Sequence, residues 1–124
     1  MRYRINNYLM YDGEVFRVVG ISLDSDLTDT YSVEAYGPDG KYLNCDVGLL
    51  EEIPLDVFWI ECLNGKYYDG PCGIKFVIFD IYPKFELRID KEKGLIGPSG
   101  NVVSSVDQLQ NLFYYYSDCK FELL

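Results

Sequence analysis

Apolar and polar residues alternate in short runs over residues 1–53, which is the spacing expected of β-strands buried on one face. The run at 8–11 leads into Asp12-Gly13, a dipeptide that favours a hairpin turn between two strands. Residues 31–45 repeat the pattern, with a group of turn residues in their middle. Several short, bent strands in succession predict a small SH3-like β-barrel in this part of the chain.

The longest of these strands is predicted over residues 15–23. Phe16 and Val18 occupy one of its faces. Its other face carries the odd-numbered positions Val15, Arg17, Val19, Ile21 and Leu23. Because a charged side chain interrupts this second face, we expect one end of it to reach solvent.

The apolar period changes from that of a strand to that of a helix after residue 53. Four apolar residues recur at the spacing of one helix face. They are Leu55, Phe58, Trp59 and Cys62. Pro54 suits the first helical position, Asp56 lies favourably in the first turn, and Asn64-Gly65 supplies a C-terminal stop. A short helix is therefore predicted over residues 54–63.

The second half of the chain is predicted as strand, strand, helix, strand. Residues 74–81 are almost entirely apolar, as in a central strand covered on both faces, whereas 85–90 alternate and have one solvated face. Ser105 and Gln108 match the capping box of a longer helix. The apolar stripe of this helix consists of Val106, Leu109, Leu112, Phe113 and Tyr116. A short strand at 120–123 closes the chain.

Together these elements predict an α+β fold in a single compact domain over residues 1–124. The SH3-like barrel over 1–53 is followed, over 54–124, by a β-sheet layer with one short and one longer helix. The length of the chain and its hydrophobic content of 48% are those of a globular domain with a real core.

The net charge of the chain bears on which class of molecule can be its partner. With 11 basic and 20 acidic residues, the formal net charge is −9, so phosphate backbones repel the protein and direct nucleic-acid binding is not expected. The acidic residues are scattered, which favours a role in solubility; the alternative is an acidic mimic of nucleic acid. No apolar run approaches the ~20 residues of a membrane span, and the N-terminal residues lack a signal peptide's apolar core. We therefore expect a cytoplasmic protein without membrane association.

The chain has four cysteines and no histidine. Without histidine, neither a Ser–His nor a Cys–His catalytic pair can form. The cysteines are separated by long, irregular gaps, which favours buried or half-buried free thiols over a zinc site. They are Cys45, Cys62, Cys72 and Cys119. The glycine-rich segment 94–100 fits neither phosphate-binding pattern and is interpreted as a plain connection. No cofactor is expected.

Two groups of carboxylates leave a metal-dependent carboxylate enzyme as the alternative class. Asp24, Asp26 and Asp29 are the nearest approach to a metal-ligand cluster, but the glycine and the later Glu of a calcium loop do not follow, which favours a solvated loop. Asp80 and Glu86 offer acid/base chemistry if the fold brings them together. With no catalytic motif to add to these groups, the sequence favours a protein that is not an enzyme.

Twelve tyrosines are the most unusual feature of the composition. Tyr67 and Tyr68 are predicted in a Gly- and Asp-rich loop. Tyr114 and Tyr115 are predicted on the last helix, where at most one of these two neighbours can face the core. Exposed tyrosines are typical of protein interfaces, so these four are the candidate binding residues. The alternative is that large rings simply surround a small core.

Three parts of the chain resemble an uncharacterised family of small SH3-like α+β proteins of gut anaerobes, many of them encoded near phage-like or conjugative elements. These parts are residues 7–13 with 16–19, 53–56 and 106–112. Proteins of this family begin with an SH3-like strand run, continue with an Ile-Pro-Leu helix and end with a helix bearing a Leu-Gln-x-Leu core. The resemblance implies that fold and a cytoplasmic setting. The family's usual His before the Leu-Gln pair is Asp107 here, so no role of that histidine carries over.

The missing catalytic set, the SH3-like pattern and the surplus of tyrosines lead to one functional expectation. The sequence predicts a non-enzymatic protein-binding or adaptor module whose partner is another protein. The resemblance adds that a mobile genetic element encodes it.

Overall fold

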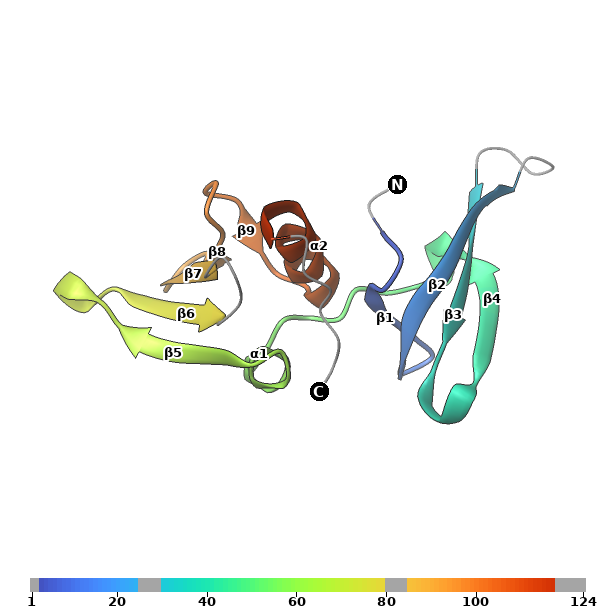
Figure 1. Cartoon of the computed structure of the whole chain (residues 1–124), viewed down its shortest axis with the longest axis horizontal. Coiled ribbons are helices and arrows are strands. Elements are labelled where there is room, and N and C mark those ends of the chain that lie inside the picture. The colour runs from blue at the N-terminus through green and yellow to red at the C-terminus, as the bar shows by residue number, and fades with distance from the viewer. Residues whose placement is uncertain (1–2, 25–29, 80–84, 118–124) are drawn as a thin grey trace. The chain divides into compact units, whose positions relative to one another are not determined.

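A computed structural model describes residues 3–24, 30–79 and 85–117. The chain divides into two compact units, Met1–Ile53 and Pro54–Leu124, and each contains a sheet of its own (Figure 1). The fold is mostly β and of the α+β class, as predicted, with two antiparallel sheets of four and five strands and two helices. The prediction that these parts form a single compact domain stays a prediction.

The first unit contains a four-stranded antiparallel sheet in the order β1-β2-β3-β4. The strands are β1 (Tyr8–Tyr11), β2 (Glu14–Asp24), β3 (Thr30–Tyr36) and β4 (Tyr42–Asp46), with short 3₁₀ turns η1 (Pro38–Gly40) and η2 (Val47–Leu49). The predicted turn between β1 and β2 is confirmed: Asp12 and Gly13 have φ of 49° and 77°, the left-handed values that this tight hairpin requires. A single bridge between Met10 and Glu51 adds one residue beside β1.

The described strands of this unit do not close into a barrel, so the predicted SH3-like barrel is not shown. After β4 the chain enters η2, and within the described residues only Glu51 then pairs with β1. One bridge cannot form the ladder that barrel closure requires.

A bulge in β2 makes one part of the predicted face pattern wrong. Phe16 and Val18 share a face, as predicted, and this face is buried, with the two side chains 2% and 0% exposed. The register shifts between Val18 and Gly20, so Ile21 turns to the core side and packs beside Val18. An extra residue of this kind cannot be seen in a period-two pattern.

The second unit contains a five-stranded antiparallel sheet in the order β5-β6-β7-β8-β9. Its strands are β5 (Gly65–Asp69), β6 (Lys75–Phe79), β7 (Phe85–Asp90), β8 (Gly94–Ile96) and β9 (Val102–Val103), and its helices are α1 (Val57–Cys62) and α2 (Val106–Ser117), with η3 (Pro71–Gly73) between β5 and β6. The sequence pattern predicts β6, β7 and both helices but misses the other three strands. The predicted strand at 120–123 lies outside the described residues.

The core of this unit lies between one face of the sheet and the two helices. It consists of Ile60, Leu63, Val77, Phe79, Leu87, Val103, Leu109 and Phe113. The Phe79 and Phe113 rings meet edge to face, with centroids 5.1 Å apart. On the other face of β6, Phe76 and Ile78 are only half-buried, so the prediction that both faces of this strand are covered was wrong.

Helix α1 is shorter and turned differently from the prediction. Its N-cap is Asp56, whose Oδ1 accepts a hydrogen bond from the backbone N–H of Trp59 over 3.0 Å. Starting at this cap, the helix buries Trp59, Ile60 and the following Leu63 and leaves the Phe58 side chain 65% exposed. The predicted stripe was therefore wrong at Phe58, because the face of the helix that meets the core runs through Trp59, Ile60 and Leu63.

Helix α2 confirms its predicted core positions Val106, Leu109 and Phe113, which are 0% exposed. Its first turn differs in one detail. The Oε1 of Gln108 accepts hydrogen bonds from the backbone N–H and the hydroxyl of Ser104, at 2.8 and 3.1 Å, and not from Ser105 as the capping box predicts.

Three hairpins of the chain share the turn sequence Gly-Pro-Xaa-Gly, at 37–40, 70–73 and 97–100. In each, the backbone N–H of the first glycine donates to the carbonyl four residues on, over 2.6–2.8 Å. In the first two, the third residue, Asp39 or Cys72, has a φ near 60° and the final glycine follows with a positive φ. The repeated turn connects β3 to β4, β5 to β6 and β8 to β9.

The cysteines are free where the structure describes them, but they are not uniformly buried. Cys45 and Cys62 are half-buried, whereas Cys72 is exposed, because it occupies the tip of a hairpin. Cys119 lies outside the described residues. No helix in the described part of the chain is long and apolar enough to cross a membrane.

Candidate functional site

One face of the five-stranded sheet is packed against the helices, and no described helix packs against the opposite face, which we call the open face. Residues directly opposite each other on neighbouring strands share a face. The strand registers place one such residue from every strand side by side on the open face. In strand order they are Tyr68, Phe76, Arg88, Ile96 and Val102, and we call them the open-face row. The open-face row crosses the whole sheet, with aromatic side chains at one end, a cationic side chain in the middle and aliphatic side chains at the other end.

The aromatic end of the row is a stacked pair. The Tyr68 and Phe76 rings lie 5.1 Å apart, with 16° between their planes, and both are half-buried. Burial, the hydrogen bond between the Tyr68 and Glu86 side chains, and the charge of Glu86 all raise the pKa of Tyr68. The stacked rings form the aromatic end of the row on the neighbouring strands β5 and β6.

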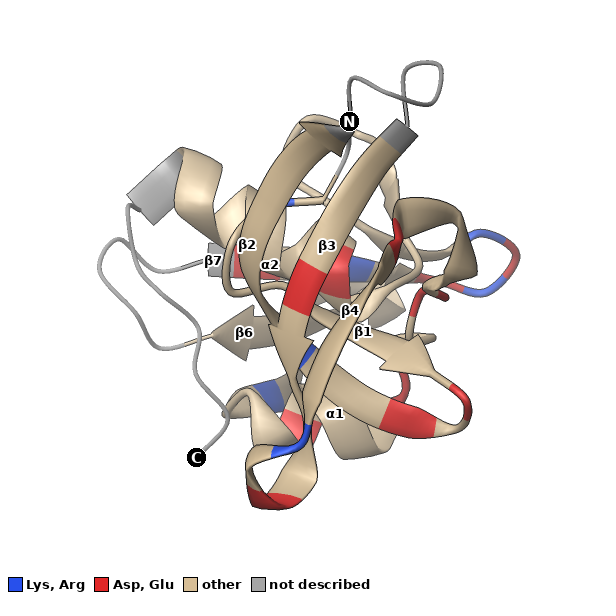
Figure 2. Ribbon diagram, turned by 90° about the vertical axis from the view of Figure 1, so that its right-hand side faces the viewer, with Lys and Arg blue, Asp and Glu red and all other residues tan. Residues whose placement is uncertain are grey.

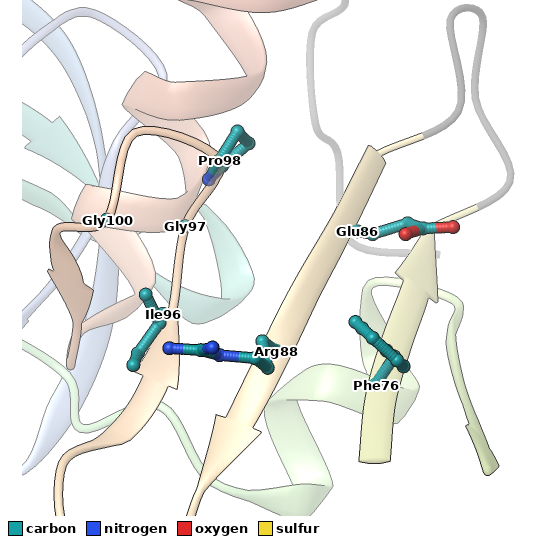
Figure 3. Close-up of a pocket in the computed structure, with 7 residues that line it drawn as sticks. All are labelled: Phe76, Glu86, Arg88, Ile96, Gly97, Pro98 and Gly100. Carbon is teal, nitrogen blue, oxygen red and sulfur yellow. The ribbon is translucent and has the colours of Figure 1, made fainter. Parts of the chain in front are cut away.

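A groove of about 340 Å³ lies along the middle of the row (Figure 3). Its lining residues are Phe76, Glu86, Arg88, Ile96, Gly97, Pro98 and Gly100. Arg88 extends from β7 toward Ile96, while Glu86 extends toward β6. Ile96 is 7% exposed and Arg88 is exposed, so the groove offers an apolar floor beneath a guanidinium group. Such a groove suits an apolar side chain next to an acceptor or an anion.

The aliphatic end of the row is formed by Val102 on β9, whose side chain is 45% exposed. The backbone N–H of Gly97 donates to Asn101 O over 2.8 Å and closes the turn between β8 and β9, which brings Val102 opposite Ile96. The segment 94–100, predicted to be a plain connection, thus contributes a strand and one wall of the groove.

Tyr67 and Tyr68, predicted in a loop, lie in β5, and this placement separates them. Successive side chains of a strand point to opposite faces, so Tyr68 belongs to the open face and Tyr67 to the helix-side face. Tyr67 is 46% exposed, and burial followed by the charges of Glu61 and Asp56 raises its pKa. The two neighbours therefore present different surfaces to a partner.

Tyr114 and Tyr115 lie on α2, half-buried and 76% exposed respectively. Because α2 packs against the helix-side face of the sheet, these two tyrosines and Tyr68 are on opposite sides of the second unit. The four candidate tyrosines thus do not form one surface.

A second aromatic pair lies in the first unit. The rings of Tyr36 on β3 and Tyr42 on β4 are 5.5 Å apart, and their side chains are 46% and 52% exposed. Burial, then the charges of Glu34 and Tyr36, raise the pKa of Tyr42.

The acidic candidates lie mostly outside the described residues. Asp24 is the last residue of β2, whereas Asp26, Asp29 and Asp80 are not described. Within 3–24, 30–79 and 85–117, no three His, Cys, Asp or Glu residues gather as a metal site would require. Figure 2 shows acidic positions on several elements, with basic positions between them. The nucleic-acid mimic, which needs carboxylates aligned on one face, stays a prediction.

The sequence pattern did not indicate Arg88, Ile96 and Val102 as possible binding residues. Only the pairing of strands brings them together, and none belongs to a recognisable motif. The one available signal was the repeated Gly-Pro-Xaa-Gly turn, two copies of which connect strands of this sheet. No family model, no curated protein and no solved structure matches the chain.

Proposed function

We propose that the protein is a non-enzymatic binding or adaptor module, that its partner is another protein, and that the open-face row is the contact surface. The observation that carries this proposal is the row itself, with its aromatic, cationic and aliphatic side chains aligned on the open face of one sheet. Tyrosine, phenylalanine and arginine are enriched in the centres of protein interfaces. Two rings that already stack on each other also lose little side-chain entropy when a partner binds.

The polar groups of the groove support binding more than catalysis. Glu86 interacts with Tyr68, and Arg88 extends in the other direction. An acid/base pair would need two titratable groups directed at one reacting atom. The groove has instead the composition of a small interface centre, an apolar floor bordered by charges.

We further propose that the first unit follows an SH3-like plan. Three features support this: the pairing order Glu51, β1, β2, β3, β4; the 3₁₀ turn η2 between β4 and Glu51; and the bulge that bends β2. An experimental structure in which residues 51–53 pair along the whole of β1 would complete the barrel. A flat sheet whose first strand has a free edge would refute this plan.

The cellular setting is proposed from the sequence. A cytoplasmic protein of a mobile genetic element is what the resemblance supports. Fractionation of the source cells tests the location, and the genes flanking the coding sequence test the second part. Ordinary chromosomal neighbours with no phage-like or conjugative genes would count against it.

Affinity capture from the source cells, followed by native mass spectrometry, tests the binding function. Two valine substitutions make a matched pair: Val102→Asp places a charge in the open-face row, whereas Val57→Asp places one at a position on α1 that is also exposed and lies outside the row. We expect one stoichiometric protein partner with the wild type and with Val57→Asp, and its loss with Val102→Asp. Equal capture by both variants, or no stoichiometric partner at all, would contradict the proposal.

A further inference from the structure

Strand β5 is the outer strand of the five-stranded sheet and pairs, among the described strands, only with β6. The N–H of Gly70 donates to Ile74 O over 2.6 Å, which makes these two residues a hydrogen-bonded pair. Hydrogen-bonded and non-hydrogen-bonded pairs alternate along an antiparallel ladder, so the next hydrogen-bonded pair is Tyr68 with Phe76. The backbone N–H and C=O groups of Tyr67 and Asp69 are consequently directed away from β6, toward the outer edge.

Groups of this kind are the template for an additional strand. A segment laid along β5 would exchange backbone hydrogen bonds with Tyr67 and Asp69. Its side chains would alternate between the two faces of the sheet, because those of β5 do. On one face they would meet Tyr68 and the end of the open-face row, and on the other face Tyr67.

The two faces differ in charge at this edge. Asp69 shares the face of Tyr67, and the carboxylates of Asp56 and Glu61 are close enough to act on the Tyr67 hydroxyl. Among the described residues of β5 and β6, the basic group on this face is Lys75, which is directly opposite Asp69. Three carboxylates against one ammonium group make the helix-side face of the edge acidic, so it attracts cations.

The open face at the same edge carries the stacked ring of Tyr68, and the neighbouring row on this face contains Lys66, Ile78 and Glu86. The opposite charges of Lys66 and Glu86 leave the open face close to neutral at this edge. An apolar side chain opposite Tyr68 would extend the row by one member and bury part of an aromatic ring.

A second copy of the chain does not fit these charges. The acidic helix-side faces of two β5 strands would meet across the new ladder, and each chain carries a formal net charge of −9. Like charges directly opposite each other destabilise a pair of strands. The occupant that fits is a different chain with the opposite charge on one face.

We propose that the edge of β5 binds an extended segment of a partner protein by strand addition, and that this segment alternates cationic and apolar residues. Its cationic side chains lie beside Tyr67 and Asp69, and its apolar side chains extend the open-face row beyond Tyr68. This inference rests on the proposed binding function, because it names the partner segment that the row receives.

The probe is a capped peptide of about eight residues, longer than a typical strand, in which Lys and Val alternate. The control peptide has Glu in place of Lys, which keeps the length and the apolar face. Titration into the isotopically labelled full chain, followed by amide NMR, gives both affinity and location. We expect shifts centred on Tyr67 and Asp69, slower amide exchange at these residues, and no saturable binding of the Glu peptide.

Two substitutions at one position isolate the backbone contact. Tyr67→Ala removes the ring and keeps the N–H, whereas Tyr67→Pro removes the ring and the outward N–H without breaking a bond to β6. We expect Tyr67→Pro to bind the Lys peptide about tenfold more weakly than Tyr67→Ala, the effect of losing one good hydrogen bond. Equal affinities of the two variants would overturn strand addition.

Charge reversal provides a second test that does not depend on proline being tolerated. Asp69→Lys should weaken binding of the Lys peptide and allow the Glu peptide to bind. Unchanged peptide preference in this variant would overturn the charge assignment. Binding of both peptides to wild type with equal affinity would do the same.

The failures of this inference and of the proposed function are distinguishable. If Val102→Asp loses the natural partner while Tyr67→Pro retains it at full affinity, the row is the contact surface and the edge is not used. If neither variant affects capture of that partner, both ideas fail. If a gel-filtration dimer dissociates in Tyr67→Pro, the edge binds a second copy, and the assignment to a cationic partner is wrong.

Discussion

Replacing Gly37 by alanine should destabilise the first unit through one identified contact. A Cβ atom at this position would lie 2.7 Å from Cε1 of Phe16, whereas ordinary contact begins at 3.4 Å, so the ring has to retreat by 3.4 − 2.7 = 0.7 Å. Phe16 is 2% exposed and meets the Tyr11 ring edge to face at 6.1 Å, so the ring has little room to move.

The size of the effect follows from two opposing contributions. Forcing an extra methyl group into a packed core costs about 1–3 kcal/mol. The backbone of Gly37 is extended, with φ −99° and ψ −165°, so alanine adopts it without strain and gains about 0.4–1 kcal/mol by restricting the unfolded chain. The two contributions leave a net loss of about 0–2.6 kcal/mol, so the free energy of unfolding of the first unit should fall by about 1 kcal/mol.

Urea denaturation followed by the NMR amide signals of β3 measures the unfolding of this unit separately from that of the second. The matched control is Gly48→Ala, since an added Cβ there meets no atom within 4 Å, and its unfolding free energy should be unchanged or slightly higher. Combining Gly37→Ala with Phe16→Leu should recover part of the loss, because both changes act on one contact. Additive losses in the double variant, or equal stability of the two alanine variants, would refute the reasoning.

Three further outcomes follow from individual side chains. Asp56→Ala removes the α1 cap and should lower the unfolding free energy of the second unit by about 1 kcal/mol, read from Trp59 fluorescence, while Asp56→Asn should retain most of it. Two turn amides of the hairpin after β7, followed by a smaller contribution from nearby basic charges, lower the pKa of Asp90 below its ordinary 3.8. The stabilisation of the turn by Asp90 is therefore complete above pH 3.8 and is lost as the pH falls through the lower pKa of the folded state. Hydrogen exchange of the two turn amides should report this loss, and Asp90→Asn should abolish its pH dependence. Cys72 is exposed, whereas burial and then the charge of Asp46 raise the pKa of Cys45, so Cys72 should react with a disulfide reagent faster than Cys45. Cys72→Ser should remove one equivalent of fast-reacting thiol.

Local pattern predicted the elements whose shape depends on local chemistry. The alternation at 31–36 and the apolar stripe from Val106 each contain enough information for one strand and one helix, and both are confirmed. The pattern failed where one extra residue or the packing of a short element decides the outcome. The bulge near Gly20 moves Ile21 to the buried face of β2, and α1 buries Trp59 and Ile60 while Phe58 is exposed.

The candidate site was less predictable than the fold because it depends on pairing between strands. Tyr68 is a candidate by its residue type alone, and its partners in the row come from four other strands. Strand β5 itself has the sequence of a loop, because Asn64-Gly65 and Asp69-Gly70 are turn signals on both sides of a segment of only five residues. Outside the turns, the pattern of a single sequence does not indicate which strands become neighbours.

The turns contain the part of that information that the sequence does hold. At Gly70 a Cβ would lie 2.5 Å from the Phe76 ring, so only glycine lets that ring lie against the turn and under Tyr68. The same turn sequence at 97–100 sets Val102 opposite Ile96. Because a slip of one residue would move a strand's whole set of side chains to the other face, a turn that fixes register also fixes which side chains share a surface. The open-face row is therefore encoded by two glycine-proline turns at its ends as much as by the five residues that form it.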